Sequence, residues 1–244
     1  MTDRPHKDAV AIARSWRDTF ARLEGGVNRS LARSLVTPSC AQGCSHCCNQ
    51  YVDCSLTEGI AIAVRLREQP ALLRDFEAAL PELLERLRAM GELDMVSWFA
   101  ASRGCVFLGI RGQCRIYEHR PLVCLTYYVA SPPELCAVGA FGNISRVDCD
   151  LVESYGAALA QGLAQRAGIP GLWHAMVGVS VAWGLRISRV GVDAGVRHFA
   201  SLPDTDVMSP VYWQARSMRW FERHAEQATR ERVRRSLPIF TGGT

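Results

Sequence analysis

The chain has 244 residues and a formal net charge of +4, from 28 basic and 24 acidic residues. This length is enough for one domain with a sizeable hydrophobic core, and the charge is too small to indicate a partner by itself. Every basic residue except Lys7 is an arginine, and the common glycine-rich nucleotide loops do not occur. Lysine-dependent covalent catalysis and nucleotide binding through those loops are therefore not expected.

The apolar pattern does not indicate export or membrane insertion. The N-terminal residues MTDRPHKD are not followed by the apolar segment of a secretory signal. The most apolar stretch, residues 171–184, contains His174 and is too short to span a bilayer. We therefore expect a cytoplasmic protein in which residues 171–188 form a core helix and His174 is a hydrogen-bonded core histidine. Ten cysteines in such a protein indicate metal or redox chemistry, and a disulfide framework is the less favoured alternative.

Helical periodicity dominates the chain. An amphipathic stripe predicts a helix within residues 1–36, and the capping-box sequence Ser55-Leu56-Thr57-Glu58 predicts another that ends at about Glu68. Further apolar stripes predict helices over residues 73–90, 151–167, 171–188 and 211–228. Pro81 either kinks the first of these or opens its second half.

The predicted fold class is mainly α: a helical domain with cysteine-rich loops organised around a metal site or sites. We expect three parts that together form one domain. They are an N-terminal amphipathic helix over residues 1–36, a cysteine-cluster core over residues 37–150, and a C-terminal helical part over residues 151–244 that packs on the core. The arginine-rich segment 216–235 is interpreted as a solvated helix face, so nucleic acid is not an expected partner.

The first cysteine run places four thiols within nine residues. Cys40, Cys44, Cys47 and Cys48 have the spacing C-x3-C-x2-C-C. Gaps of two and three residues let the backbone loop around an ion or cluster with the sulfurs pointing inward. The side chains of the adjacent Cys47 and Cys48 diverge, which indicates either two sites back to back or one polynuclear cluster.

The second run contains Cys105, Cys114 and Cys124. Glycines between the first two predict a short hairpin or turn that presents these cysteines from its two ends. Arg120-Pro121 predicts the start of a helix, with Cys124 near its first turn. We expect the positive end of that helix to favour the Cys124 thiolate, the form that binds metal.

Together the two runs resemble the CxxCxxCC family, a zinc- or iron-chelating domain family of YkgJ-type cysteine-cluster proteins that includes flagellin lysine N-methylases. The resemblance spans about Ser39 to Cys136 and covers C-x3-C-x2-C-C, C-x-F-L, and C-x-I-Y-x-x-R-P with a further cysteine. The matching positions are Cys40, Cys44, Cys47, Cys48, Cys105, Phe107, Leu108, Cys114, Ile116, Tyr117, Arg120, Pro121 and Cys124. One departure is Leu125, where relatives commonly have arginine. If that arginine neutralises charge in relatives, its role is empty here or filled by another residue.

Cys136 also matches a cysteine that many such chains carry, and it completes a predicted set of eight metal ligands. Four thiolates suit zinc and iron–sulfur clusters alike, so the spacing leaves the metal open. The C-x3-C-x2-C spacing coincides with the radical S-adenosylmethionine motif, but the chain lacks the βα rhythm of the usual barrel. Further candidates remain open as ligands or as neighbours of the sulfurs: Cys54 (favoured as a packed thiol), Cys149, His46, His119, Tyr117 and the Asp148/Asp150 pair.

Two classes of function follow. The first is a metal-cluster enzyme that modifies a protein or peptide, such as an S-adenosylmethionine-dependent N-methylase or an oxidoreductase, as the resemblance implies. The second is a non-catalytic zinc- or iron-binding protein with a structural, sensing or carrier role. Eight thiols exceed what a structural staple needs, which favours the enzyme. Against it, no general acid–base pair stands out by spacing, and no catalytic residue, substrate or oligomeric state is predicted.

Overall fold

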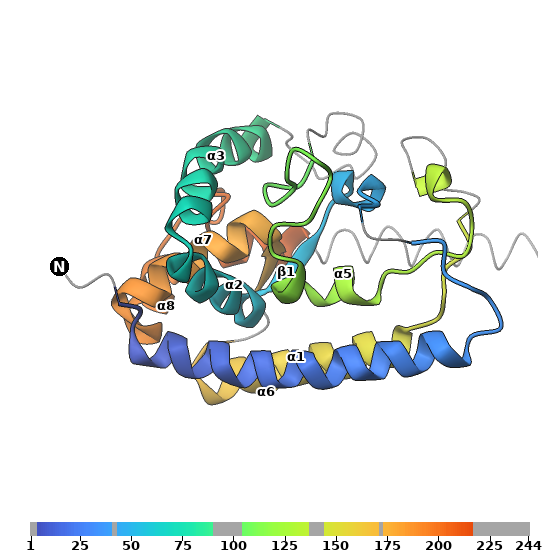
Figure 1. Cartoon of the computed structure of the whole chain (residues 1–244). Helices are drawn as coiled ribbons and strands as arrows, with labels where there is room; N and C mark the ends of the chain where they lie inside the picture. The colour runs from blue at the N-terminus through green and yellow to red at the C-terminus, as the bar shows by residue number, and fades with distance from the viewer. Residues whose placement is uncertain (1–3, 41–42, 90–103, 137–143, 171–172, 217–244) are drawn as a thin grey trace, which may run out of the picture.

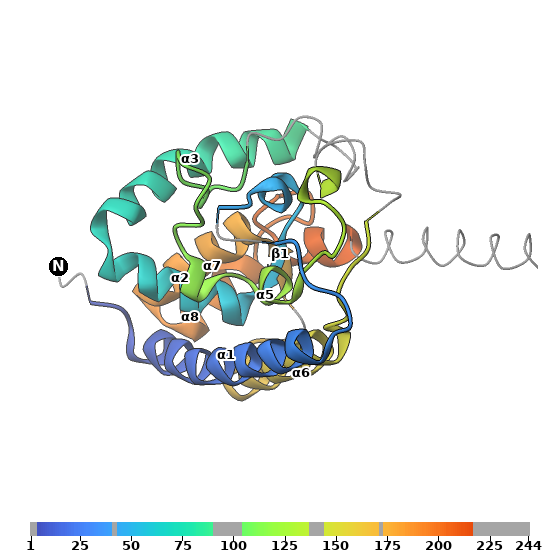
Figure 2. The same cartoon turned by 45° about the vertical axis from the view of Figure 1, so that its right-hand side comes forward.

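The computed structural model describes residues 4–40, 43–89, 104–136, 144–170 and 173–216. The fold is mainly helical, as predicted, with one two-stranded sheet in this part of the chain. The long helix α1 (Lys7–Arg33) lies along one side of the molecule, and α6 (Asp150–Arg166) lies beside it (Figures 1 and 2). No helix among the described residues is long and apolar enough to cross a membrane.

Two helices cross at the centre of the fold with their backbones in contact. They are α2 (Leu56–Glu68) and α7 (Val177–Val190). A Cβ atom on Gly59 would overlap the carbonyl of Ser180, and one on Gly184 would overlap the carbonyl of Gly59. Glycine is needed at both positions because no side chain fits between the helices. The larger hydrophobic core lies around this contact and includes residues of α1, α6 and α8 (Val192–Ala200).

Each central helix is preceded by a short strand. Strands β1 (Asp53–Ser55) and β2 (His174–Met176) pair antiparallel, with Ser55 opposite His174. The buried hydroxyl of Ser180 in α7 donates to the carbonyl of Cys54 at 2.9 Å and to that of Ala175 at 3.2 Å, which ties both strands to the helix. The predicted core helix over residues 171–188 is therefore wrong at its start. The helix begins at Val177, and His174 is a half-buried strand residue.

A second, smaller core lies between α3 (Pro70–Ala89) and the second cysteine run. Pro81 lies inside α3, which neither ends nor restarts there. The ring of Phe76 in α3 stacks on the ring of Phe107, with centroids 5.4 Å apart and planes 6° apart. Phe107 lies between Cys105 and Cys114 in sequence, so this aromatic contact fixes the cysteine-bearing hairpin on the helical body.

Most of the other predicted helices match the structure closely. The capping box at Ser55 is confirmed, with both of its reciprocal hydrogen bonds, and α2 ends at Glu68 as predicted. Helix α1 lies within residues 1–36, and α6 begins one residue before the predicted 151–167. Residues 210–216 are helical, and the rest of the predicted last helix lies outside the described residues. Arg216 does not fit a solvated face, because it is buried and lies 4.7 Å from the ring centroid of Tyr212.

We predict that Gly184→Ala lowers the free energy of unfolding by about 1–3 kcal/mol or more, because the added methyl group forces α2 and α7 apart. Chemical denaturation followed by circular dichroism measures this. The matched control is Gly25→Ala in α1, where the nearest atom to a new Cβ is the flexible end of Arg29, at 3.5 Å. That variant should be more stable by about 0.5–1 kcal/mol, since alanine favours the helix. Equal effects of the two substitutions would contradict the close contact.

Candidate metal centre

The start of the first cysteine run is hydrogen-bonded to Val129, which follows the last cysteine of the second run in sequence. The backbone N–H of Val129 donates to Cys40 Sγ at 3.4 Å, and the N–H of Ser39 donates to the Val129 carbonyl at 2.8 Å. The 3-10 turn η1 (His46–Asn49) then presents Cys47 and Cys48, and it contacts the turn η3 (Pro133–Cys136). Cys136 is thereby brought to the first run.

The predicted hairpin of the second run is present. Leu108 and Cys114 form an antiparallel bridge, and the N–H of Arg115 donates to the carbonyl of Phe107 at 2.9 Å. Gly112 occupies the turn with φ of 77°, a backbone conformation that favours glycine. The two ends of the hairpin therefore carry Cys105 and Cys114, as the sequence indicates.

The two hairpin cysteines share one hydrogen-bonding arrangement that the sequence analysis missed. Cys105 accepts a hydrogen bond from the backbone N–H of Phe107, and Cys114 accepts one from that of Ile116, in each case two residues later. Burial raises the pKa of Cys105 to about 12, and these N–H donors act against burial at both thiols. Backbone donors aimed at sulfur favour the thiolate, the form that ligates metal.

Cys124 lies in the short helix α5 (Leu122–Thr126), whose position depends on a buried carboxylate. Glu58 accepts hydrogen bonds through Oε2 from the backbone N–H and the hydroxyl of Ser55, at 2.8 and 2.7 Å. Its Oε1 accepts a 2.7 Å hydrogen bond from the N–H of Leu122, the first residue of α5. Glu58 therefore caps α2 and α5 together, and no sequence pattern indicates the second of these caps.

The expectation that the helix end favours the Cys124 thiolate is wrong. Burial raises the pKa of Cys124 well above its ordinary value, and the negative charges of Cys105, Cys47, Cys114 and Glu58 raise it further. The helix has only five residues, and its first N–H is already bonded to Glu58. The positive helix end is therefore weak and offset by the carboxylate.

The thiols of both runs lie within electrostatic reach of one another. Burial is the main cause of the raised pKa at five thiols, and the charge of Cys47 adds to it at each: Cys40, Cys105, Cys114, Cys124 and Cys136. The pKa of Cys47 is itself raised, first by a hydrogen bond with Cys48 and then by burial. Cys44 acts in the same way on Cys40 and Cys136. We call these eight residues the cysteine cluster, and Cys47 connects its two halves.

The donor chemistry of this cluster fits zinc or iron. All eight thiols are free, and soft sulfur ligands suit both zinc and iron–sulfur clusters. Within the described residues, no group of three or more Cys, His, Asp or Glu side chains is arranged to hold a metal ion. Thiolates that approach one another repel, and bonds to a metal cation supply the free energy that draws such ligands together.

Arg120 brings a positive charge to this region. Its side chain is 6% exposed, its Nη1 donates to the Tyr117 carbonyl at 3.1 Å, and its guanidinium lies 3.9 Å from the centroid of the Tyr117 ring. Its Nη2 lies 3.7 Å from Glu24 Oε1. Arg120 lowers the pKa of Cys114 against the stronger effect of burial. Arg120 is thus placed to neutralise cluster charge where the chain has Leu125 instead of arginine.

The remaining candidates lie elsewhere or have other roles. Cys54 is buried in the smaller core and packs there as expected of a structural thiol. Cys149 is buried in the larger core, and its electrostatic neighbours are Asp148, Arg146, Asp150 and Glu153, with no cluster thiol among them. Burial lowers the pKa of His119, whose neighbours are charged residues such as Arg65. His46 is carried by η1 beside Cys47.

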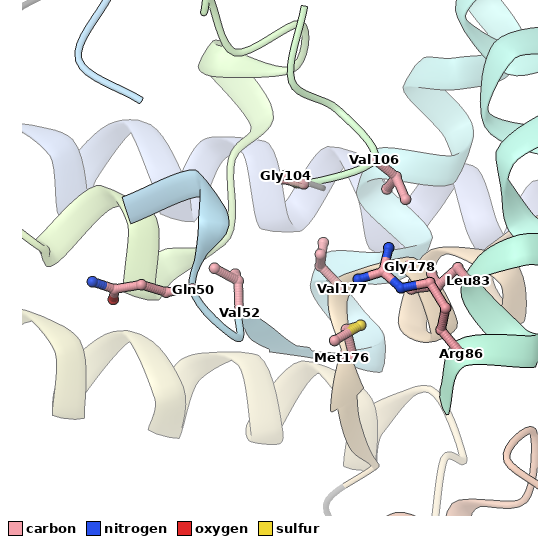
Figure 3. Close-up of a pocket in the computed structure, with 10 residues that line it drawn as sticks. Gln50, Val52, Leu83, Arg86, Gly104, Val106, Met176, Val177 and Gly178 are labelled. Atoms are coloured by element: carbon pink, nitrogen blue, oxygen red, sulfur yellow. The ribbon is translucent and has the colours of Figure 1, made fainter. Parts of the chain in front are cut away.

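A small cavity lies beside Cys105 (Figure 3). Its volume is about 30 Å³, which is room for roughly one water molecule. Arg86 reaches from α3 towards Gly178 at the start of α7, and Val52 and Val106 line other parts of the wall. This cavity by itself is too small for a substrate.

We predict that Glu58→Gln lowers the free energy of unfolding by about 1–3 kcal/mol, because the amide nitrogen of glutamine cannot accept the bonds that one carboxylate oxygen accepts now. Alkylation of Cys124 in the folded protein should also become faster as α5 loosens, which mass spectrometry detects. Glu118→Gln, at an exposed position of η2 (Tyr117–His119), is the control and should change neither quantity. An unchanged alkylation rate in Glu58→Gln would contradict this role.

Comparison with known proteins supports this assignment. Residues 39–146 match the family model described as "CxxCxxCC: Putative zinc- or iron-chelating domain". The match begins at Ser39 and includes all eight residues of the cysteine cluster. Searches of curated proteins and of solved structures found no match. Residues 39–146 are therefore similar to the domains that this model describes as zinc- or iron-chelating, which supports metal binding by this part of the chain.

Proposed function

We propose that this protein binds iron or zinc at one composite site to which both cysteine runs contribute. The observation that carries the proposal is the position of Cys47, whose charge acts on thiols of the first run, the hairpin, α5 and η3. The proposed ligands are the eight residues of the cysteine cluster. A polynuclear centre suits this set, because adjacent Cys47 and Cys48 do not serve one mononuclear ion equally well.

The surroundings of the cluster support a charge-compensated site. Thiolates at these buried positions near Glu58 would carry negative charge that Arg120 offsets only in part, which is why their pKa values are raised. A bound divalent metal would remove most of this repulsion and would favour thiolates whose pKa is now raised. Metal binding should therefore release protons and stabilise the folded chain.

We further propose that the metal centre belongs to an enzyme that modifies a protein or peptide. The resemblance to a family that includes flagellin lysine N-methylases supports this, as does the number of thiols. In S-adenosylmethionine-dependent N-methylation, the methyl carbon moves from the sulfonium sulfur to an amine nitrogen. S-Adenosylhomocysteine leaves, and the nitrogen loses a proton. The alternative is a non-catalytic zinc- or iron-binding protein with a structural, sensing or carrier role.

We predict that protein purified without oxygen contains more than one equivalent of iron or zinc, and that Cys47→Ser loses metal held by both runs. A composite site predicts this joint loss because Cys47 connects its halves. Elemental and sulfide analysis, together with absorption spectra, measures it and separates iron from zinc.

The matched control is Cys54→Ser, a buried thiol in the smaller core, which should keep the wild-type metal content. Two outcomes contradict the composite site. One is a Cys47→Ser protein that keeps all metal bound through Cys114 and Cys124. The other is a folded wild-type protein with free thiols and no affinity for either metal.

If the metal centre is catalytic, S-adenosylmethionine or a peptide substrate should alter it. We predict heat of binding and a changed metal spectrum when S-adenosylmethionine is titrated into the metal-loaded protein, since a catalytic metal keeps a coordination position open. S-Adenosylhomocysteine with the same adenosyl group is the comparison ligand. A fully sulfur-ligated metal that responds to neither ligand nor to peptides assigns the protein to the non-catalytic class.

A further inference from the structure

A polar cavity of about 360 Å³ lies between the two-stranded sheet, α5 and α6. Four titratable side chains line it, one from each of four elements: Asp53 of β1, Glu58 of α2, Glu153 of α6 and His174 of β2. Among the described residues that line it, none is a cysteine, an arginine or a lysine. Alanines of α6 and the side chains of Leu122 and Val123 form its apolar wall. The cavity is large enough for a small organic molecule and is chemically separate from the cysteine cluster.

Asp53 and His174 form a hydrogen-bonded pair within this wall. The Nδ1 atom of His174 lies 3.2 Å from Oδ2 of Asp53. A carboxylate only accepts hydrogen bonds, so Nδ1–H is the donor and Nε2 is the ring nitrogen that exchanges protons with another partner. Burial lowers the pKa of His174, but the bond and charge of Asp53 together with the charge of Glu58 outweigh burial and raise it. The protonated imidazolium is therefore favoured more strongly here than in a free histidine.

The other carboxylates make the cavity negatively charged. Glu58 is held by Ser55 and Leu122, as described above. Glu153 accepts a 2.7 Å hydrogen bond from the hydroxyl of Thr126 through Oε2, and Arg146 lies 3.9 Å from the same oxygen. An ionised carboxylate offers about four lone-pair sites, so Asp53 and Glu153 can each accept further hydrogen bonds. Three carboxylates face one imidazole, which disfavours an anionic ligand and favours a cation.

We propose that this cavity binds a small organic cation that carries an ammonium group. The N–H groups of the ligand donate to Asp53 and Glu153, its carbon chain packs on the alanines of α6, and His174 releases a proton as the ligand enters. Because an imidazolium repels the cation, affinity rises as the pH rises through the pKa of His174. No thiol contributes to this site, so a test of ligand binding here is independent of whether the metal centre is as proposed.

The test uses the full-length, metal-loaded protein and three probes of equal chain length: 1,4-diaminobutane, 1,4-butanediol and succinate. Calorimetry measures affinity, and NMR of labelled histidine follows the His174 ring. We expect 1,4-diaminobutane to bind best, to lower the pKa of His174 and to weaken with added salt. Succinate should not bind. Tighter binding of succinate than of the diamine, or no binding of the diamine, would overturn the proposal.

Substitutions connect the binding to these residues. Asp53→Asn keeps the shape of the half-exposed side chain, should weaken 1,4-diaminobutane about fivefold, and should lower the pKa of His174. The matched control is Asp8→Asn. The carboxylate of Asp8 lies 3.3 Å from Nδ1 of His6, and neither residue lines this cavity. It should leave the affinity unchanged. His174→Gln should bind the diamine without the pH dependence that titration of His174 imposes. Equal affinities of Asp53→Asn and Asp8→Asn for 1,4-diaminobutane would refute the assignment, because the charge of Asp53 would then make no contribution to binding.

Discussion

The hydrogen bonds of Glu58 are the interaction that fixes the second half of the site on the central helices. This carboxylate is 4% exposed, and it bonds the start of α2 through one oxygen and the start of α5 through the other. A buried charge is costly unless hydrogen bonds and nearby partial charges compensate it, and two helix N-termini provide this compensation. The result is a fixed position for α5, and hence for Cys124, relative to the central helices. Glu58 also lines the polar cavity, so the same residue contributes to the surroundings of Cys124 and to the thiol-free site.

Two different contacts hold the cysteine-bearing segments. Phe107 fixes the hairpin by stacking on Phe76 of α3, and Val129 holds Cys40 by its backbone N–H. Behind them, Gly59 and Gly184 let α2 and α7 touch, which leaves little freedom for the strands that precede these helices. Short helices, turns and a hairpin on this body therefore bring thiols that are distant in sequence, such as Cys40 and Cys136, into one electrostatic group.

The electrostatics of the cluster and of the cavity differ in kind. In the cluster, burial and the repulsion of neighbouring thiols raise the pKa values, so the neutral thiol is favoured unless a cation enters. Arg120 contributes a fixed positive charge at Cys114. In the cavity, carboxylates surround one imidazole and raise its pKa. Both regions favour positive charge, but sulfur donors select a soft metal and oxygen donors select a hard or organic cation.

The sequence by itself determined the helical class, most helix positions and the identity of the cysteine-rich domain, because these depend on local patterns. Periodicity placed α1 within residues 1–36 and predicted α6 to within one residue at each end. The capping box predicted where α2 starts. The capping box at Ser55 and the glycine turn at Gly112 are equally local, because neighbouring residues complete them. The two-part cysteine motif likewise needs only spacing to be recognised.

Only the tertiary structure decided how these pieces combine. The strand at His174 could not be predicted, because three residues form a strand only when Asp53–Ser55 lie beside them. The second bond of Glu58 joins residues 64 positions apart. Burial and the neighbouring thiols, with a smaller effect of Glu58, raise the pKa of Cys124 against the expected effect of the helix end. The packing of loops on the helical body decides which thiols lie near Cys47. It also keeps Cys149 away from the cysteine cluster. Spacing along the chain carries no information on such contacts, because chain segments distant in sequence supply the neighbouring charges, donors and burial.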